Sequence, residues 1–197
     1  MKIKFFNSNK NQLYCGPPGL EIKFFFTAIA SDNTISWFDN RNVVYFHKAR
    51  VAIRYACELL GIGAGDTILA PSYNCGSEID PLYKSGAEVS LYRVDEAGQI
   101  DTGDLQKRIN AKTRLIYVTH YFGFPHDLTI IKKICKENGI LLLEDCALSL
   151  FSNYPDREKI GSAGDISVFS FTKTLPVPDG GVMVINNPIL NSNQHVL

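Results

Sequence analysis

The sequence of 197 residues lacks an excess of charge of either sign, because 20 lysine and arginine residues balance 20 aspartate and glutamate residues. A zero net charge removes the general electrostatic attraction to nucleic acids and to anionic membrane surfaces. No apolar run approaches the ~20 residues that a membrane-spanning helix needs. The longest run, Phe24 to Ala30, has the length of a buried strand. We therefore expect neither a nucleic-acid partner nor a membrane partner.

Closely spaced cysteine pairs are also absent, although the chain contains five cysteines. Without a Cys-x-x-Cys pair, the sequence predicts neither a zinc site nor a redox dithiol, and we name no metal ligands. The odd number and wide spacing of the cysteines favour buried, reduced thiols. The corresponding prediction is a cytoplasmic protein.

The chain changes character near residue 46. Residues 1–46 are rich in aromatic and turn-forming residues, and no chemical role is apparent for them. Residues 47–190 alternate apolar strands with stretches of helical periodicity, and residues 191–197 form a polar tail. Alternating strands and helices predict an α/β fold, with an open, mostly parallel sheet flanked by helices.

Reactive side chains follow two of the predicted strands. In an open parallel sheet, ligands bind beyond the carboxyl ends of the strands. The apolar run Ile140–Leu143 is followed closely by Asp145, and the strand at 166–169 is followed by Ser170 and Lys173. A carboxylate for a cationic ring nitrogen, a hydroxyl for phosphate and an amine for an aldehyde are what pyridoxal 5'-phosphate requires. Taken singly, each residue also has an ordinary explanation, such as a loop acid or a solvated lysine.

An ordered series of motifs between about Lys48 and Asn187 resembles the DegT/DnrJ/EryC1/StrS family, the sugar aminotransferase branch of fold type I pyridoxal phosphate enzymes. The motifs that carry the resemblance are Gly61-Ile-Gly-Ala-Gly-Asp66, Ala70-Pro-Ser-Tyr73, His120-Tyr-Phe-Gly123, Leu142-Leu-Glu-Asp145, Gly161-Ser-Ala-Gly-Asp165, Phe169-Ser-Phe171, Lys173 and Asp179-Gly-Gly181. The resemblance implies the large domain of fold type I, with the C-terminal small domain missing.

The resemblance also implies roles for individual residues. Lys173 aligns with the catalytic lysine that bonds the cofactor's aldehyde and then moves protons. Asp145 aligns with the acid that pairs with the ring nitrogen, and Ser170 aligns with a phosphate ligand. Ala49 and Arg50 open a helix whose backbone N–H groups are expected to attract the phosphate.

Several positions depart from the family pattern or carry weaker assignments. Cys75 stands where many relatives stack an aromatic ring on the cofactor, and Leu148 stands where many have glutamine or histidine. These departures indicate a divergent branch. Glu78 and His120 are candidate substrate contacts. The ordinary alternatives are a surface acid on a helix for Glu78 and a hydrogen-bonded histidine at a strand end for His120.

By this resemblance we expect a pyridoxal-phosphate-dependent aminotransferase. It would move an amino group from an amino acid donor, such as glutamate or glutamine, to a keto group of a nucleotide-linked sugar in polysaccharide or secondary metabolite biosynthesis. Active sites of the family form between subunits, so a homodimer is expected. The alternative is a truncated, inactive relative that acts as an interaction partner. Lys173 argues against the related sugar dehydratases, which carry histidine there, and a generic nucleotide-binding domain also stays open.

Overall fold

A computed structural model describes residues 37–38 and 41–191 of the chain. The strand expected at residues 24–30 and the tail beyond residue 191 lie outside the described residues. The strands are β1 (Asn42–Phe46), β2 (Thr67–Pro71), β3 (Glu88–Tyr92), β4 (Thr113–Thr119), β5 (Leu141–Asp145), β6 (Ile166–Ser170) and β7 (Gly181–Ile185). The α-helices are α1 (Ala49–Leu59), α2 (Gly76–Tyr83), α3 (Thr102–Arg108), α4 (Thr129–Asn138) and α5 (Pro188–Asn191), and two 3-10 turns lie at η2 (Tyr121–Gly123) and η3 (Phe171–Lys173).

The seven strands form one sheet in the order β1-β7-β6-β5-β4-β2-β3. The pairs from β3 to β6 are parallel, whereas β7 runs antiparallel to both β6 and β1. The expected α/β fold with a mostly parallel sheet is confirmed.

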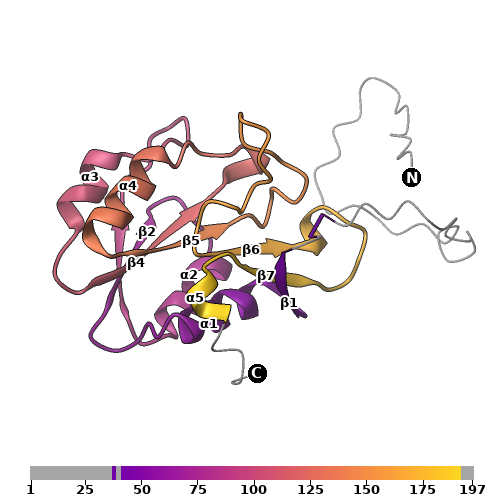
Figure 1. Cartoon of the computed structure of the whole chain (residues 1–197), viewed down its shortest axis with the longest axis horizontal. Helices are drawn as coiled ribbons and strands as arrows, with labels where there is room; N and C mark the ends of the chain where they lie inside the picture. The colour runs from indigo at the N-terminus through magenta and orange to yellow at the C-terminus, as the bar shows by residue number, and fades with distance from the viewer. Residues whose placement is uncertain (1–36, 39–40, 192–197) are drawn as a thin grey trace, which may run out of the picture.

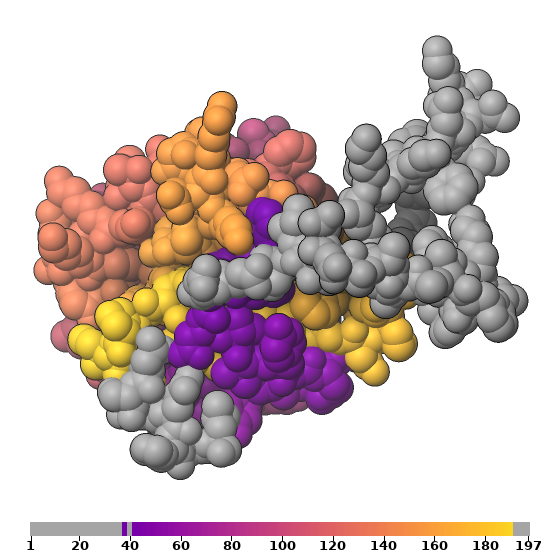
Figure 2. Space-filling model, turned by 45° about the vertical axis from the view of Figure 1, so that its right-hand side comes forward, coloured from indigo at the N-terminus to yellow at the C-terminus, as the bar shows by residue number. Residues whose placement is uncertain are grey.

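Strand β1 is the main difference from the expected organisation. Its residues pair with β7 from Asn42↔Ile185 to Phe46↔Gly181. The boundary expected after residue 46 therefore comes immediately after a strand that is part of the sheet. Figure 2 shows the indigo surface of β1 and α1 next to the yellow surface of the C-terminal part, which is distant in sequence. Residues 42–46 therefore belong with the sheet rather than with a separate N-terminal segment.

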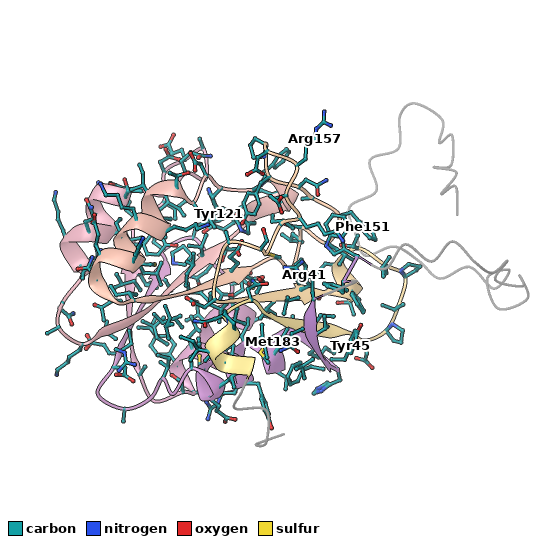
Figure 3. All side chains as sticks on the ribbon, in the orientation of Figure 1. Arg41, Tyr45, Tyr121, Phe151, Arg157 and Met183 are labelled. Carbon is teal, nitrogen blue, oxygen red and sulfur yellow. The ribbon has the colours of Figure 1, made fainter. Side chains whose placement is uncertain are left out.

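The helices cover both faces of the sheet, with α1, α2 and α5 on one side and α3 and α4 on the other (Figure 1). Apolar side chains of the strands fill both interfaces: Met183 lies on the α1 side (Figure 3), and Leu142 packs against α4 residues on the other. Because both faces are covered, β6 and β7 are buried along their whole length. Within the described ranges, no helix combines the length and the apolar character that crossing a bilayer requires.

Candidate active site

The residues expected to hold a cofactor gather at one edge of the sheet. Parallel pairing brings the carboxyl ends of β2, β4, β5 and β6 to the same edge. Ser170 at the end of β6 pairs with Gly181 in β7, and Gly181 pairs with Phe46 at the end of β1. The end of β6 and the residues that lead from β1 into α1 therefore lie side by side across β7. Asp145 ends the strand next to β6. Neighbouring strands are about 4.8 Å apart, so this edge brings together groups that are far apart in the sequence.

Asp145 is a buried carboxylate that is held by two hydrogen bonds. Its exposed fraction is 1%. The Tyr117 hydroxyl donates to Oδ2, and the backbone N–H of Ala147 donates to Oδ1 over 2.8 Å. Burial raises the pKa of Asp145 to about 6, a rise that the Tyr117 bond opposes and that the nearby Glu78 carboxylate reinforces. The group is therefore largely ionised at neutral pH and ready to pair with a cation.

Glu144, the preceding residue, belongs to a different network. Its Oε2 lies 3.0 Å from His120 Nε2 and also accepts from the Tyr154 hydroxyl, whereas Oε1 accepts from the Ala163 N–H over 2.8 Å. Although burial raises the pKa of Glu144, the hydrogen bonds with His120 and Tyr154 leave it below the ordinary value. Since consecutive residues of a strand point to opposite faces of the sheet, the side chains of Glu144 and Asp145 lie on opposite sides of the sheet.

His120 is fully buried between these partners. Its Nδ1 accepts the backbone N–H of His126 over 3.0 Å, so Nδ1 carries no proton, and Nε2–H is left to donate to Glu144. Both ring nitrogens are thus engaged inside the protein. The geometry favours the alternative of a hydrogen-bonded histidine at a strand end over the expected substrate contact.

Lys173 lies in the turn η3 directly after β6, and its side chain is exposed. The connection from η3 to β7 is fastened to the start of α1: Lys48 Nζ pairs with Asp179 over 2.7 Å and donates to the Pro178 carbonyl over 3.0 Å. Gly181 also lies against this helix start, because a Cβ built on it would be 2.5 Å from Ala49 N. The catalytic lysine expected from the sequence is therefore in a segment anchored at the proposed phosphate site.

Helix α1 begins at Ala49, the residue expected to open a helix. Its N-cap residue, Lys48, makes no side-chain capping bond, and no acidic residue lies in the first turn. An uncapped helix start offers backbone N–H groups to an anion. Arg50 is exposed, and its Nη2 donates to Ser77 Oγ over 3.2 Å. Ser170 is buried at the end of β6, where Oγ lies 3.2 Å from Thr172 Oγ1.

Cys75 and Glu78 meet at the start of α2. Cys75 is the N-cap residue, and its Sγ donates to Glu78 Oε1 over 3.4 Å. Glu78 is close enough to Asp145 to raise the pKa of that carboxyl, after the larger effect of burial. Cys75 is also near enough to Tyr117 to contribute, after burial and the Asp145 charge, to the raised pKa of that phenol. Leu148 is 41% exposed.

Two residues beside Asp145 were not anticipated from the sequence. Tyr117 is fully buried in β4 and contacts the carboxylate directly. Thr119 pairs in register with Asp145, is 5% exposed, and its Oγ1 has no hydrogen-bond partner among residues 37–38 and 41–191. One sequence signal would have identified both Tyr117 and Thr119. Each is a polar residue in an otherwise apolar strand, and the next strand of the sheet ends in an acidic residue.

A cavity of about 680 Å³ is lined in part by Tyr73, Tyr121 and His126. The rings of Tyr73 and Tyr121 lie 5.2 Å apart, and the Tyr121 hydroxyl donates to the Tyr73 carbonyl over 2.6 Å. His126 lines the cavity at 7% exposure, and its Nε2 has no partner within the described part of the chain. Burial lowers the pKa of His126 to about 4, with His120 adding to the effect.

The pKa of His126 predicts a loss of stability in acid. A lowered pKa in the folded state means that the unfolded chain binds more protons between the ordinary value of about 6.5 and about 4. Folding stability that is present above pH ~6.5 is therefore lost as the pH falls through this window. We expect His126→Asn to remove this loss, so that urea unfolding shows the wild type losing roughly 2–3 kcal/mol more than the variant between pH 7 and about pH 4.5. Parallel stability curves for the two proteins would contradict the prediction.

Comparison with known proteins agrees with the family resemblance of the sequence motifs. The sequence model of the DegT/DnrJ/EryC1/StrS aminotransferase family matches residues 33–197. GDP-perosamine synthase of Vibrio cholerae is 31% identical over 143 residues, which are 71% of this chain and 39% of that protein. The dTDP-4-dehydro-2,3,6-trideoxy-D-glucose 4-aminotransferase of Saccharopolyspora spinosa is 29% identical over 155 residues, covering 77% of this chain and 40% of that protein.

Solved structures agree with the sequence relatives. The crystal structure of the aminotransferase TlmJ from Streptoalloteichus hindustanus superposes with a TM-score of 0.71 at 30% identity, covering 77% of this chain and 42% of that one. An aminotransferase from Psychrobacter cryohalolentis gives a TM-score of 0.71 at 28% identity, covering 78% and 40% of the two chains. The chain therefore spans about two fifths of the length of these relatives.

Proposed function

Because the chain belongs to the DegT/DnrJ/EryC1/StrS aminotransferase family, we propose that it binds pyridoxal 5'-phosphate and takes part in amino transfer to a nucleotide-linked sugar. The observation that supports the proposal is the strand pairing that places Asp145, Ser170 and the residues leading into α1 at one edge of the sheet, with Lys173 in the turn η3 that directly follows β6. The names of the relatives, a GDP-sugar enzyme and a dTDP-sugar enzyme, support the class of acceptor. The donor would be an amino acid such as glutamate or glutamine.

The residues at this edge fit the cofactor. Asp145 is ionised and still has lone pairs free for a ring N–H, because each of its oxygens accepts one described bond. The unpartnered hydroxyl of Thr119 beside it fits a ligand that supplies the missing partner, since an unsatisfied buried group costs free energy. The uncapped start of α1 and Ser170 suit a phosphate.

Each residue then has a chemical task. When bound, pyridoxal phosphate supplies an aldehyde and an electron-accepting ring. Asp145 would keep the ring nitrogen protonated by the attraction of opposite charges. Lys173 would hold the cofactor at its aldehyde through Nζ and would hold and move the proton at the substrate carbon. Ser170 and the N–H groups of Ala49 and Arg50 would orient the phosphate, with Cys75 against the ring.

The remaining assignments complete the proposal. Residues 42–190 would form the cofactor-binding domain of an enzyme that acts in the cytoplasm. Two copies would pair so that each completes the other's active site. Glu78, whose carboxylate accepts from Cys75 Sγ, would contact the substrate.

The test is reconstitution with the cofactor. Adding pyridoxal phosphate to the purified chain is expected to produce a visible absorption band, and borohydride is expected to fix the cofactor on Lys173, as mapped by peptide mass spectrometry. Lys173→Ala should lose both signals, whereas Lys132→Ala, which removes an exposed lysine on α4, should keep them. Absence of the band, or an unchanged band in Lys173→Ala, would favour the inactive relative.

A further inference from the structure

Tyr117 is a polar side chain in the interior of the sheet, with a single described side-chain partner. It lies in β4 at 0% exposure, and its hydroxyl donates to Asp145 Oδ2. Its ring packs among the apolar side chains on the α1 side of the sheet, such as Leu115 and Leu143. Its backbone carbonyl accepts from the hydroxyl of Tyr92 over 2.9 Å. The hydroxyl of Tyr117 therefore faces the carboxylate from a rigid, fully packed position.

This arrangement fixes which group donates. Burial, followed by the charge of Asp145, raises the pKa of Tyr117 well above its ordinary value, so the phenol keeps its proton. A phenol that can only donate to the carboxylate stabilises the charged form of that carboxylate. The bond also fixes the plane of the carboxylate, because the N–H of Ala147 holds the other oxygen.

The surroundings of Asp145 otherwise oppose its charge. Burial and the Glu78 carboxylate raise its pKa, whereas Tyr117, Ala147 and His120 lower it. The other titratable groups near this region are the phenol of Tyr121 and the thiol of Cys75 on neighbouring elements, and the thiol of Cys146, which directly follows Asp145 in the chain. Among the groups that favour the charged carboxylate, Tyr117 supplies the side-chain hydrogen bond.

We propose that Tyr117 is a positioning residue for the cofactor: its hydroxyl keeps Asp145 charged and oriented toward the pyridine nitrogen. The inference rests on the proposed function, because it assigns the carboxylate to that nitrogen. It concerns an interaction inside the protein that exists before any ligand binds, and it can therefore be measured without one.

The test compares Tyr117→Phe with Tyr92→Phe. Both variants remove one hydroxyl from a fully buried tyrosine and keep the ring, but the Tyr92 hydroxyl bonds a backbone carbonyl instead of Asp145. In the protein without cofactor, carboxyl ¹³C NMR is expected to show the Asp145 titration moving to higher pH by about one unit in Tyr117→Phe, a roughly tenfold change in its protonation equilibrium. Tyr92→Phe should leave the titration near that of the wild type.

Binding then separates the role from general packing. Tyr117→Phe is expected to weaken pyridoxal phosphate binding several-fold at pH 7, but to leave unchanged the binding of the analogue with carbon in place of the ring nitrogen. An unshifted Asp145 titration, or equal weakening for cofactor and analogue, would overturn the inference even if the wild type binds the cofactor. Failure of the wild type to bind pyridoxal phosphate would reject the proposed function, and this inference with it.

Discussion

Replacing Asp145 with asparagine is expected to slow amino transfer by roughly 10²–10³-fold, the cost of removing one preorganised electrostatic partner. Asparagine has nearly the same volume but no charge, so it cannot hold a proton on the ring nitrogen. The measurement is the rate at which L-glutamate changes the absorption of the cofactor-loaded chain under single-turnover conditions.

The matched control is Asp165→Asn, which neutralises an acid at the opposite edge of the sheet, where Asp165 accepts from the Leu142 N–H over 2.8 Å. Circular dichroism on all three proteins shows whether each variant stays folded. An Asp145→Asn protein that reacts as fast as the wild type would remove the carboxylate from the proposed mechanism. Equal losses in both variants would point to a general effect on the fold.

Gly181→Ala is expected to destabilise the fold by about 3 kcal/mol or more, toward the upper end of the cost of overpacking. The new Cβ would lie 2.5 Å from Ala49 N and equally close to the Lys48 carbonyl oxygen, and backbone atoms cannot rotate away as a side chain can. The start of α1 must then move, so we also expect weaker phosphate binding. Urea denaturation measures the first effect, and titration with inorganic phosphate measures the second.

Gly76→Ala provides the comparison for this substitution. A Cβ on Gly76 would meet nothing within 4 Å, and the residue begins α2, so alanine there should be neutral or slightly stabilising. If Gly181→Ala proves as stable as Gly76→Ala, the close contact between β7 and α1 is not as tight as the structure indicates.

The sequence predicts the central part of this fold well because its signals are local. The strand at 141–145 begins within the continuous apolar run Ile140–Leu143, and Gly139 ends the helix before it with φ 64°. The positions of Asp145 and Ser170 follow from a general rule about strand ends, which needs no knowledge of distant contacts.

The features that sequence reasoning missed depend on partners far away in the chain. Strand β1 is short and is recognised only by its pairing with β7, about 140 residues later. The bond from Tyr117 to Asp145 joins residues 28 positions apart, and it depends on the register between β4 and β5. Neither local composition nor periodicity encodes such a register, so both features needed the three-dimensional structure.

The alternation of Glu144 and Asp145 across the sheet sets a limit on how this protein can evolve. Deleting or inserting one residue within β5 would exchange the two acids, because each step along a strand turns the side chain over. Glu144 would then face Tyr117 with a side chain one methylene longer, and Asp145 would fall short of His120. Substitutions can accumulate in this strand, but a change in its length would disrupt the hydrogen bonds of both carboxylates at once.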